Sequence, residues 1–270
     1  MSIKFFAPHW GNVLPFDSFC QNVKAAGYNG VEMALPFAKK EKEETIAILK
    51  TYDLELIGQY YQSFERDLQE HLQSYEKHLW NLVEVEPLFI NCQTGKDYYT
   101  FEQNQTLFEA AARIARESSV RIIHETHRGK SLFAAHITQE YLTYLPDLRI
   151  CLDISHWCAV HESLLDDQNE AVSQAISRTD HIHSRVGFPE GPQVNDPRAS
   201  EWAETLNAHL TWWDRVVEKH RAADTRLTIN TEFGPAPYMP QQPHTQEPLA
   251  SQWDVNVFMM RLLKERYDLG

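Results

Sequence analysis

Four short apolar segments of the sequence end in residues that could bind a metal ion or transfer a proton. They are residues 120–125 with Glu125, 149–153 with Asp153, 180–183 with His183, and 227–232 with Glu232. A carboxylate that emerges from an apolar strand must be hydrogen-bonded, paired with a cation or bound to a metal, because a bare buried charge is costly. Four such segments in one chain therefore indicate a shared site.

The four side chains together would supply three carboxylates and one imidazole. Such a donor set suits Mn²⁺, Mg²⁺ or Co²⁺ better than a thiolate-rich zinc site would, and it is also compatible with Zn²⁺. Without a cation the clustered carboxylates would repel one another. Taken singly, each side chain could instead cap a helix, form an ion pair or satisfy a hydrogen bond of the core. Their joint placement favours a metal centre.

Strand-like segments and helical patterns alternate along the whole chain. The segments above would be strands five to eight, and we expect strands one to four at residues 3–7, 30–33, 54–59 and 88–92. Helices are expected at residues 17–26, 40–52, 66–85, 101–117, 133–146, 163–178, 200–221 and 253–267. Asp17 is expected to cap the first helix and Gly27 to end it in the left-handed conformation.

This alternation predicts an α/β fold, a single (β/α)8 TIM barrel that forms one domain over residues 1–270. Active sites of such barrels lie at the carboxyl ends of the strands. Because side chains alternate between the two faces of a strand, Cys151 and Asp153 share the inner face, as do Ile123 and Glu125. All four candidate ligands can therefore point into the barrel mouth.

Composition and charge narrow the class of protein further. The formal net charge of −13 argues against a nucleic-acid partner, since binding to phosphates rests on Lys and Arg. No apolar run is long enough to cross a membrane, and no signal-peptide pattern is present. The four cysteines form no C-x-x-C pair, so we expect reduced thiols and a cytoplasmic location.

The order of the polar strand ends also resembles a known superfamily. Glu, then Asp-x-x-His, then His-x-His, then Glu is similar to the pattern of the xylose isomerase-like TIM barrels, which include sugar phosphate isomerases and epimerases and endonuclease IV; residues 26–32 resemble its second-strand entry. The resemblance implies that one divalent ion (Mn, Mg, Co or Zn) is held by Glu125, Asp153, His183 and Glu232. It also implies that His156 contacts substrate oxygens.

The same resemblance implies an enzyme, a metal-dependent isomerase or epimerase of a sugar or sugar derivative. A base would remove the proton next to a carbonyl and leave an enediolate, with Glu125 and Glu232 as the base and acid on opposite faces of the sugar. His127, on the same face as Glu125, is predicted to contact the small-molecule sugar or sugar phosphate. We expect no nucleic-acid partner and no membrane partner. The chain could form a homo-oligomer.

The loop at residues 184–198 departs from the pattern of the ketohexose epimerases. It is rich in Gly and Pro, and loops of this kind often close over substrates. Arg185 and Arg198 in this loop would suit a carboxylate or phosphate on the substrate, or would instead pair with Glu190 or Asp196. Arg185 is therefore predicted to bind substrate.

Three other functions stay open at this point. An inosose dehydratase-like lyase could use the same metal and base, expelling a hydroxyl after proton abstraction. An endonuclease IV-like phosphodiester hydrolase would need more metal ions and a basic surface for DNA. The net negative charge of the chain disfavours such a surface. A binding protein that has lost catalysis need not have kept both Glu125 and Glu232.

Overall fold

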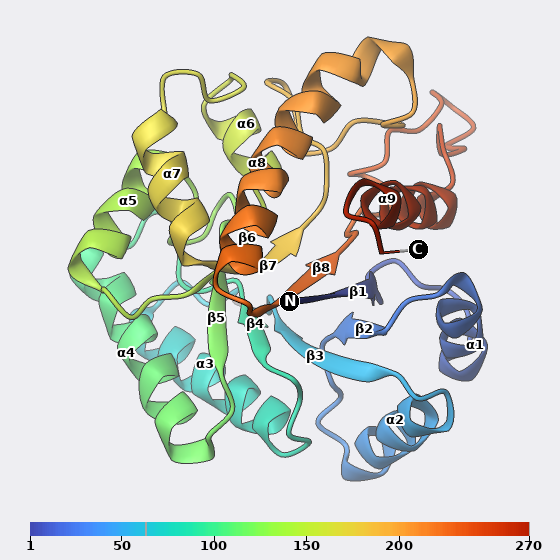
Figure 1. Ribbon diagram of the computed structural model, residues 1–270. Coiled ribbons are helices and arrows are strands. Elements are labelled where there is room, and N and C mark those ends of the chain that lie inside the picture. The colour runs from blue at the N-terminus through green and yellow to red at the C-terminus, as the bar shows by residue number, and fades with distance from the viewer. Residues whose placement is uncertain (63, 270) are drawn as a thin grey trace.

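The computed structural model describes residues 1–62 and 64–269, and within them eight parallel strands close into one barrel in sequence order (Figure 1). The strands are β1 (Ser2–Pro8), β2 (Gly30–Met33), β3 (Glu55–Tyr60), β4 (Ile90–Cys92), β5 (Ile122–Glu125), β6 (Ile150–Leu152), β7 (Thr179–His183) and β8 (Arg226–Asn230). The last strand pairs with the first, since Ile3 is opposite Leu227. The predicted (β/α)8 TIM barrel is confirmed.

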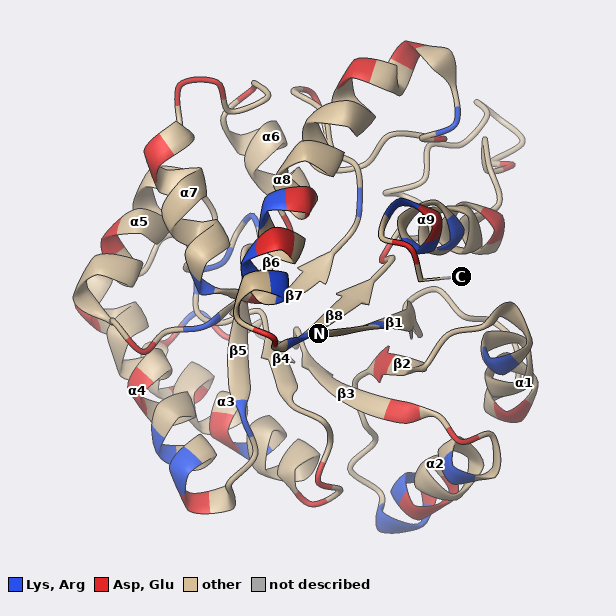
Figure 2. Ribbon diagram, viewed as in Figure 1, with Lys and Arg blue, Asp and Glu red and all other residues tan. Residues whose placement is uncertain are grey.

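Helices surround the barrel and connect its strands (Figure 1). They are α1 (Phe16–Ala26), α2 (Lys39–Thr51), α3 (Leu68–Val83), α4 (Phe101–Ser118), α5 (Ala135–Tyr144), α6 (Ser155–Val160), α7 (Asn169–Arg178), α8 (Ala203–Ala222) and α9 (Gln252–Arg266), with a 3-10 turn η1 (Ser200–Trp202) before α8. Acidic and basic residues alternate along the outer helices, most visibly on α2 and α8 (Figure 2). Within the described residues, no helix combines the length and apolarity that a membrane span needs.

Two local predictions differ from the structure. Asp17 does not cap α1: the cap position is Pro15, and the Asp17 carboxylate instead accepts a hydrogen bond from the Tyr52 hydroxyl at 3.2 Å. Gly27 does end the helix in the left-handed conformation, with φ of 95°. The helix expected at residues 163–178 is observed as the shorter α7, and the additional helix α6 precedes it. At the start of α6 the backbone N–H of Ser155 donates to Oδ1 of Asp153 at 3.1 Å.

The inside of the barrel is apolar at one level and polar at the next. Its apolar layer consists of Phe6, Ile57, Phe89, Ile123 and Cys151. Since residues two apart in a strand share a face, the layer nearer the carboxyl ends contains the side chains two positions further on. Those residues are polar in four strands, namely Gln59, Asn91, Glu125 and Asp153. The strand pleat thus places a group of buried polar side chains at the barrel mouth.

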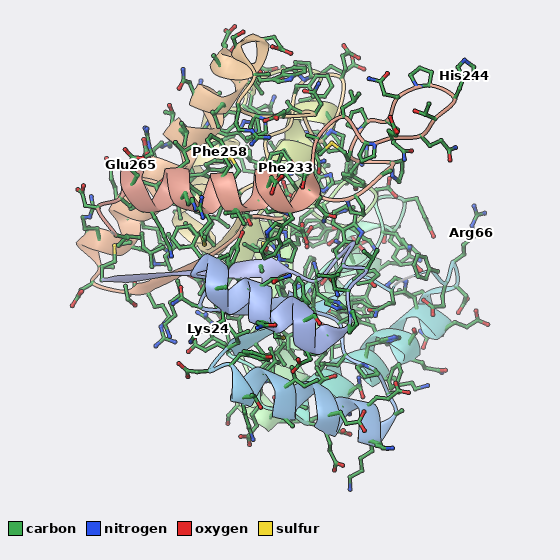
Figure 3. All side chains as sticks on the ribbon, turned by 90° about the vertical axis from the view of Figure 1, so that its right-hand side faces the viewer. Lys24, Arg66, Phe233, His244, Phe258 and Glu265 are labelled. Carbon is green, nitrogen blue, oxygen red and sulfur yellow. The ribbon has the colours of Figure 1, made fainter. Side chains whose placement is uncertain are left out.

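The loops that follow the strands form the rim of that mouth. Arg66, in the loop after β3, and His244, in the loop after β8, project on the same side of the molecule (Figure 3). The loop after β8 is long and carries Tyr238, whose ring meets that of Trp10 edge-on at 4.9 Å between centroids. Aromatic side chains from the loops after β1 and β8 therefore meet at this rim.

Candidate active site

The four side chains that the sequence assigned to one site come together in the structure. Glu125, Asp153, His183 and Glu232 each offer a ligand atom, and these atoms lie within 4.8 Å of one another. Each residue is at most 3% exposed. Strands β5 to β8 thus converge on one buried cluster of three carboxylates and one imidazole.

The orientation of His183 tests whether this cluster fits a metal ion. Its Nε2 lies 3.1 Å from both oxygens of Glu32, so Nδ1 is turned toward the cluster, 2.7 Å from Oε2 of Glu232 and 3.8 Å from Oε1 of Glu125. Among the described residues, this buried Nδ1 has no hydrogen bond of acceptable geometry. A ring nitrogen surrounded by carboxylate oxygens is the arrangement that a divalent cation requires of its ligands. The residues present therefore fit a metal ion.

Side-chain amides hold the two glutamates in place. Gln59 donates from Nε2 to Oε1 of Glu232 at 2.8 Å. Gln93 donates to Oε1 of Glu125 at 3.3 Å, and Asn91 donates to its Oε2 at 3.2 Å. Because the amides come from β3 and β4, the orienting groups and the ligands lie on opposite halves of the barrel.

Crowding and burial make the cluster electrostatically unfavourable without a cation. Burial raises the pKa of Glu125 to about 8, with the charges of Glu232 and Asp153 adding to the effect and His183 opposing it. Burial also raises the pKa of Asp153, against the charge of Arg185. A divalent cation among these oxygens would favour the ionised forms and so reverse both shifts.

Arg185 supplies a positive charge to the cluster. The buried guanidinium donates from Nη2 to Oδ2 of Asp153 and to Nε2 of His156, the latter at 2.7 Å, and from Nε to the hydroxyl of Ser155 at 3.2 Å. Burial would lower the pKa of Arg185, but the charges of Asp153, Glu232 and Glu125 together outweigh burial and raise it. Arg185 thus pairs inside the site and not with Glu190.

Arg198, the second arginine of that loop, lies at the surface. It forms a two-point contact with Asp196, from Nε to Oδ1 at 2.7 Å and from Nη2 to Oδ2 at 2.6 Å. The sequence analysis had offered pairing with Asp196 as the alternative to substrate binding. The structure shows this pairing, so the guanidinium of Arg198 already has a carboxylate partner.

Two imidazoles lie next to the cluster at different depths. The rings of His127 and His156 are 3.9 Å apart between centroids. His127 lines the cavity described below, whereas His156 is fully buried in α6 and accepts the hydrogen bond from Arg185. Burial lowers the pKa of both side chains well below the ordinary value, so both are neutral near neutral pH.

A cavity of about 180 Å³ opens above the cluster. It is lined by Trp10, Gln59, Tyr61, Gln93, His127, Arg185, Glu232 and Tyr238. Three aromatic rings thus surround a set of amide, imidazole, guanidinium and carboxylate groups. Such a cavity suits a small polar molecule with one or more C–H faces.

Glu32 was missed as a site residue by the reasoning from sequence. It lies in β2 between Val31 and Met33, is fully buried, and contacts the imidazole of His183. The sequence did carry a signal for Glu32, namely a carboxylate within an apolar strand. Such a carboxylate needs buried partners, as that of Asp153 does.

A closed parallel barrel with a buried ligand cluster at the carboxyl ends of its strands defines the class of (β/α)8 proteins with a metal-type site at the mouth. Within that class, the chain belongs to the xylose isomerase-like TIM barrel family, whose sequence profile matches residues 20–189. The superfamily resemblance seen in the sequence is thereby confirmed.

Individual relatives are distant. An inosose dehydratase of Mesomycoplasma hyopneumoniae (strain J) is 22% identical over 200 residues, which span 65% of this chain and 64% of that relative's length. A D-tagatose 3-epimerase-like protein superposes with a TM-score of 0.65 at 13% identity, covering 98% of this chain and 97% of its own. A probable 3-DHS dehydratase from Bacillus anthracis gives 0.61 at 16% identity, covering 97% and 98%. The two solved structures show the shared fold.

Proposed function

We propose that the protein is a divalent-metal-dependent isomerase or epimerase that moves a proton next to the carbonyl of a sugar or sugar derivative. The observation that carries the proposal is the buried cluster itself, in which Nδ1 of His183 faces the carboxylates of Glu125 and Glu232 below a small cavity. Membership of the xylose isomerase-like TIM barrel family supports the proposal, and so does the structural similarity to a D-tagatose 3-epimerase-like protein.

In this proposal Glu125, Asp153, His183 and Glu232 hold the metal ion. When bound, the ion would polarise the substrate carbonyl and so acidify the neighbouring C–H group. Either Glu125 or Glu232 removes that proton, leaving an enediolate, and the other carboxylate returns a proton to the opposite face in an epimerase or to the adjacent carbon in an isomerase. The two carboxylates suit this pair of roles because they come from β5 and β8 and are oriented by different amides.

The cavity residues would position the sugar. Trp10, Tyr61 and Tyr238 offer ring faces to its C–H groups, and the neutral His127 can exchange a hydrogen bond with a hydroxyl. Arg185 would donate to a further hydroxyl from its place in the cavity wall. Since the charge of Arg185 is already paired with Asp153, an uncharged sugar or cyclic polyol ketone fits this cavity better than a phosphate ester does.

A second candidate is a dehydratase that acts on an inosose or a related ketone. The match to an inosose dehydratase favours it. Glu125 or Glu232 would remove the same proton, and the hydroxyl on the next carbon would leave as water after accepting a proton. Phosphodiester hydrolysis is less favoured, because the cavity is small and closed in by aromatic rings.

Proton exchange tests the proposal directly. The protein, loaded in turn with Mn²⁺, Mg²⁺, Co²⁺ and Zn²⁺, would be incubated in D₂O with ketoses and inososes, and deuterium uptake followed by NMR. Uptake with a new stereoisomer or positional isomer indicates an epimerase or isomerase, and uptake with loss of water indicates a dehydratase. Glu125→Gln and Glu232→Gln should abolish exchange, whereas Glu190→Gln, a change in the loop after β7, should not. Normal turnover by either of the first two variants would refute the assigned roles.

A further inference from the structure

Glu32 is the centre of a buried hydrogen-bond network beneath the ligand cluster. Its Oε2 accepts from Nε2 of His181 at 3.0 Å and from Nδ2 of Asn230 at 2.6 Å, and its Oε1 accepts from Nδ2 of Asn91 at 2.9 Å. Nε2 of His183 lies 3.1 Å from both oxygens. Side chains from β4, β7 and β8 thus converge on one carboxylate of β2 that is fully buried.

The hydrogen atoms of this network can be assigned by counting donors. Asn91 has two amide hydrogens and two carboxylate acceptors within reach, Glu32 at 2.9 Å and Glu125 at 3.2 Å. Its 3.3 Å approach to Nε2 of His183 therefore needs no hydrogen. If Nε2 carried no hydrogen, its lone pair would face two carboxylate oxygens at 3.1 Å, which is repulsive. Nε2 therefore carries the hydrogen and donates it to Glu32.

We infer that Glu32 is a positioning residue that keeps a hydrogen on Nε2 of His183 and so turns Nδ1 toward the ligand cluster. An ionised carboxylate can only accept hydrogen bonds, so it requires a hydrogen on the ring nitrogen that faces it. The contact also fixes the rotation of the ring, since the other nitrogen lies 2.7 Å from Glu232. The consequence for metal binding rests on the proposed function, whereas the hydrogen bond from Nε2 does not.

Glu32→Gln is the sharpest perturbation of this contact. The amide keeps one acceptor oxygen but turns the other into a donor, so four donors would compete for one oxygen and an NH₂ group would face part of the network. When that NH₂ group faces His183, Nε2 must accept instead of donating, so the one hydrogen of the ring stays on Nδ1. That hydrogen would occupy the side that faces the carboxylates. We expect metal affinity to fall by about 10–100-fold, as when the outer partner of a metal-binding histidine is lost.

Asn230→Ala is the matched control. Asn230 donates to the same oxygen of Glu32, and its own Oδ1 has no hydrogen-bond partner in the part of the chain that the structure describes. Its removal costs the network one donor but leaves the contact between Glu32 and His183. The hydrogen on Nε2 of His183 and the metal affinity should both stay close to those of the wild type.

The experiment uses ¹⁵N-histidine-labelled, metal-free protein and long-range ¹H–¹⁵N correlation spectra, with the His183 signals assigned by their loss in His183→Gln. Wild-type His183 should show a hydrogen on Nε2, with a low-field, slowly exchanging Hε2 signal. Glu32→Gln should lose this signal and, by titration calorimetry with Mn²⁺, show weaker binding. Circular dichroism would verify that each variant is folded.

Two results would overturn the inference. One is a wild-type His183 without a hydrogen on Nε2 or without the bonded Hε2 signal, which can be recorded whether or not any variant folds. The other is a folded Glu32→Gln protein with the wild-type Hε2 signal and wild-type Mn²⁺ affinity. Neither result depends on turnover of a sugar. The role of Glu32 could therefore be supported in a protein without isomerase activity and refuted in an active one.

Discussion

Asp180 offers the clearest test of how charge stabilises the barrel at the ends of the strands away from the site. The carboxylate at the start of β7 accepts from Nε of Arg149 at 2.9 Å and, on its other oxygen, from Nη2 of the same residue. Arg121 reaches it at 3.3 Å and Lys219 at 3.9 Å. Since the Asp180 side chain is only 11% exposed, it depends on these cations.

Asp180→Asn should lower the free energy of unfolding by about 2 kcal/mol near neutral pH. A hydrogen bond to a charged group contributes about 1.5–3 kcal/mol, and asparagine keeps one acceptor while placing an NH₂ group against the other donor of Arg149. We take a value in the lower half of this range because Arg149 is 33% exposed and water can replace the lost contact.

The pH dependence of this difference has a definite sign. Burial alone would raise the pKa of Asp180, but the hydrogen bonds and charge of Arg149 hold it below its ordinary value. A lowered native pKa stabilises the folded state above the unfolded pKa of about 3.9, and this contribution is lost as the pH falls through the native pKa. The difference in the free energy of unfolding between wild type and Asp180→Asn should therefore be largest near pH 7 and become smaller below about pH 4.

Urea unfolding followed by circular dichroism at several pH values measures this gap. Asp147→Asn, which removes an exposed carboxylate nearby in the chain, serves as the control and should change little. An equal gap at pH 7 and well below pH 4 would show that the effect is packing rather than charge. The absence of any gap at pH 7 would refute the assigned stabilisation.

Three further predictions concern close contacts and metal binding. Gly30→Ala places a Cβ atom 2.2 Å from the backbone oxygen of Glu55, so the soluble yield and melting temperature should both fall sharply; a wild-type melting temperature would contradict this. Gly187→Ala places a Cβ atom 2.4 Å from the backbone oxygen of Ser155, so metal-dependent kcat/KM should drop while circular dichroism shows a folded protein. Unchanged kcat/KM would show that this loop can move freely. Mn²⁺ at about 100 times its Kd should stabilise the wild type by about 2.7 kcal/mol in thermal unfolding but not Glu232→Gln, and equal stabilisation of both would place the ion elsewhere.

The barrel could be predicted because each strand and helix carries its own local pattern. The second strand was predicted at residues 30–33 and is observed at Gly30–Met33. Helix α6 was missed because six residues are too few to show a helical period. Its position depends on distant contacts, such as the hydrogen bond from the Trp157 indole to the backbone oxygen of Leu132.

The candidate ligands could be predicted because each stands at or just beyond the end of an apolar strand, where the fold places active sites. Their surroundings could not. Glu32 lies within a strand, and its four donors come from β4, β7 and β8, so the network follows only from the registers of a closed barrel. Likewise the sequence offered Glu190 as a partner for Arg185, whereas the structure pairs it with Asp153, which precedes it by more than thirty positions.

The split of the site between the two halves of the barrel has a consequence for biosynthesis. All four candidate ligands lie in or just after β5 to β8, and the groups that orient them, Glu32, Gln59 and Asn91, lie in β2 to β4. On the ribosome the orienting half emerges first and has no ligands to orient. The ligands come together only when β8 pairs with β1, after Glu232 has been synthesised. A nascent chain could thus complete the ligand cluster only after β8 and Glu232 have left the ribosome.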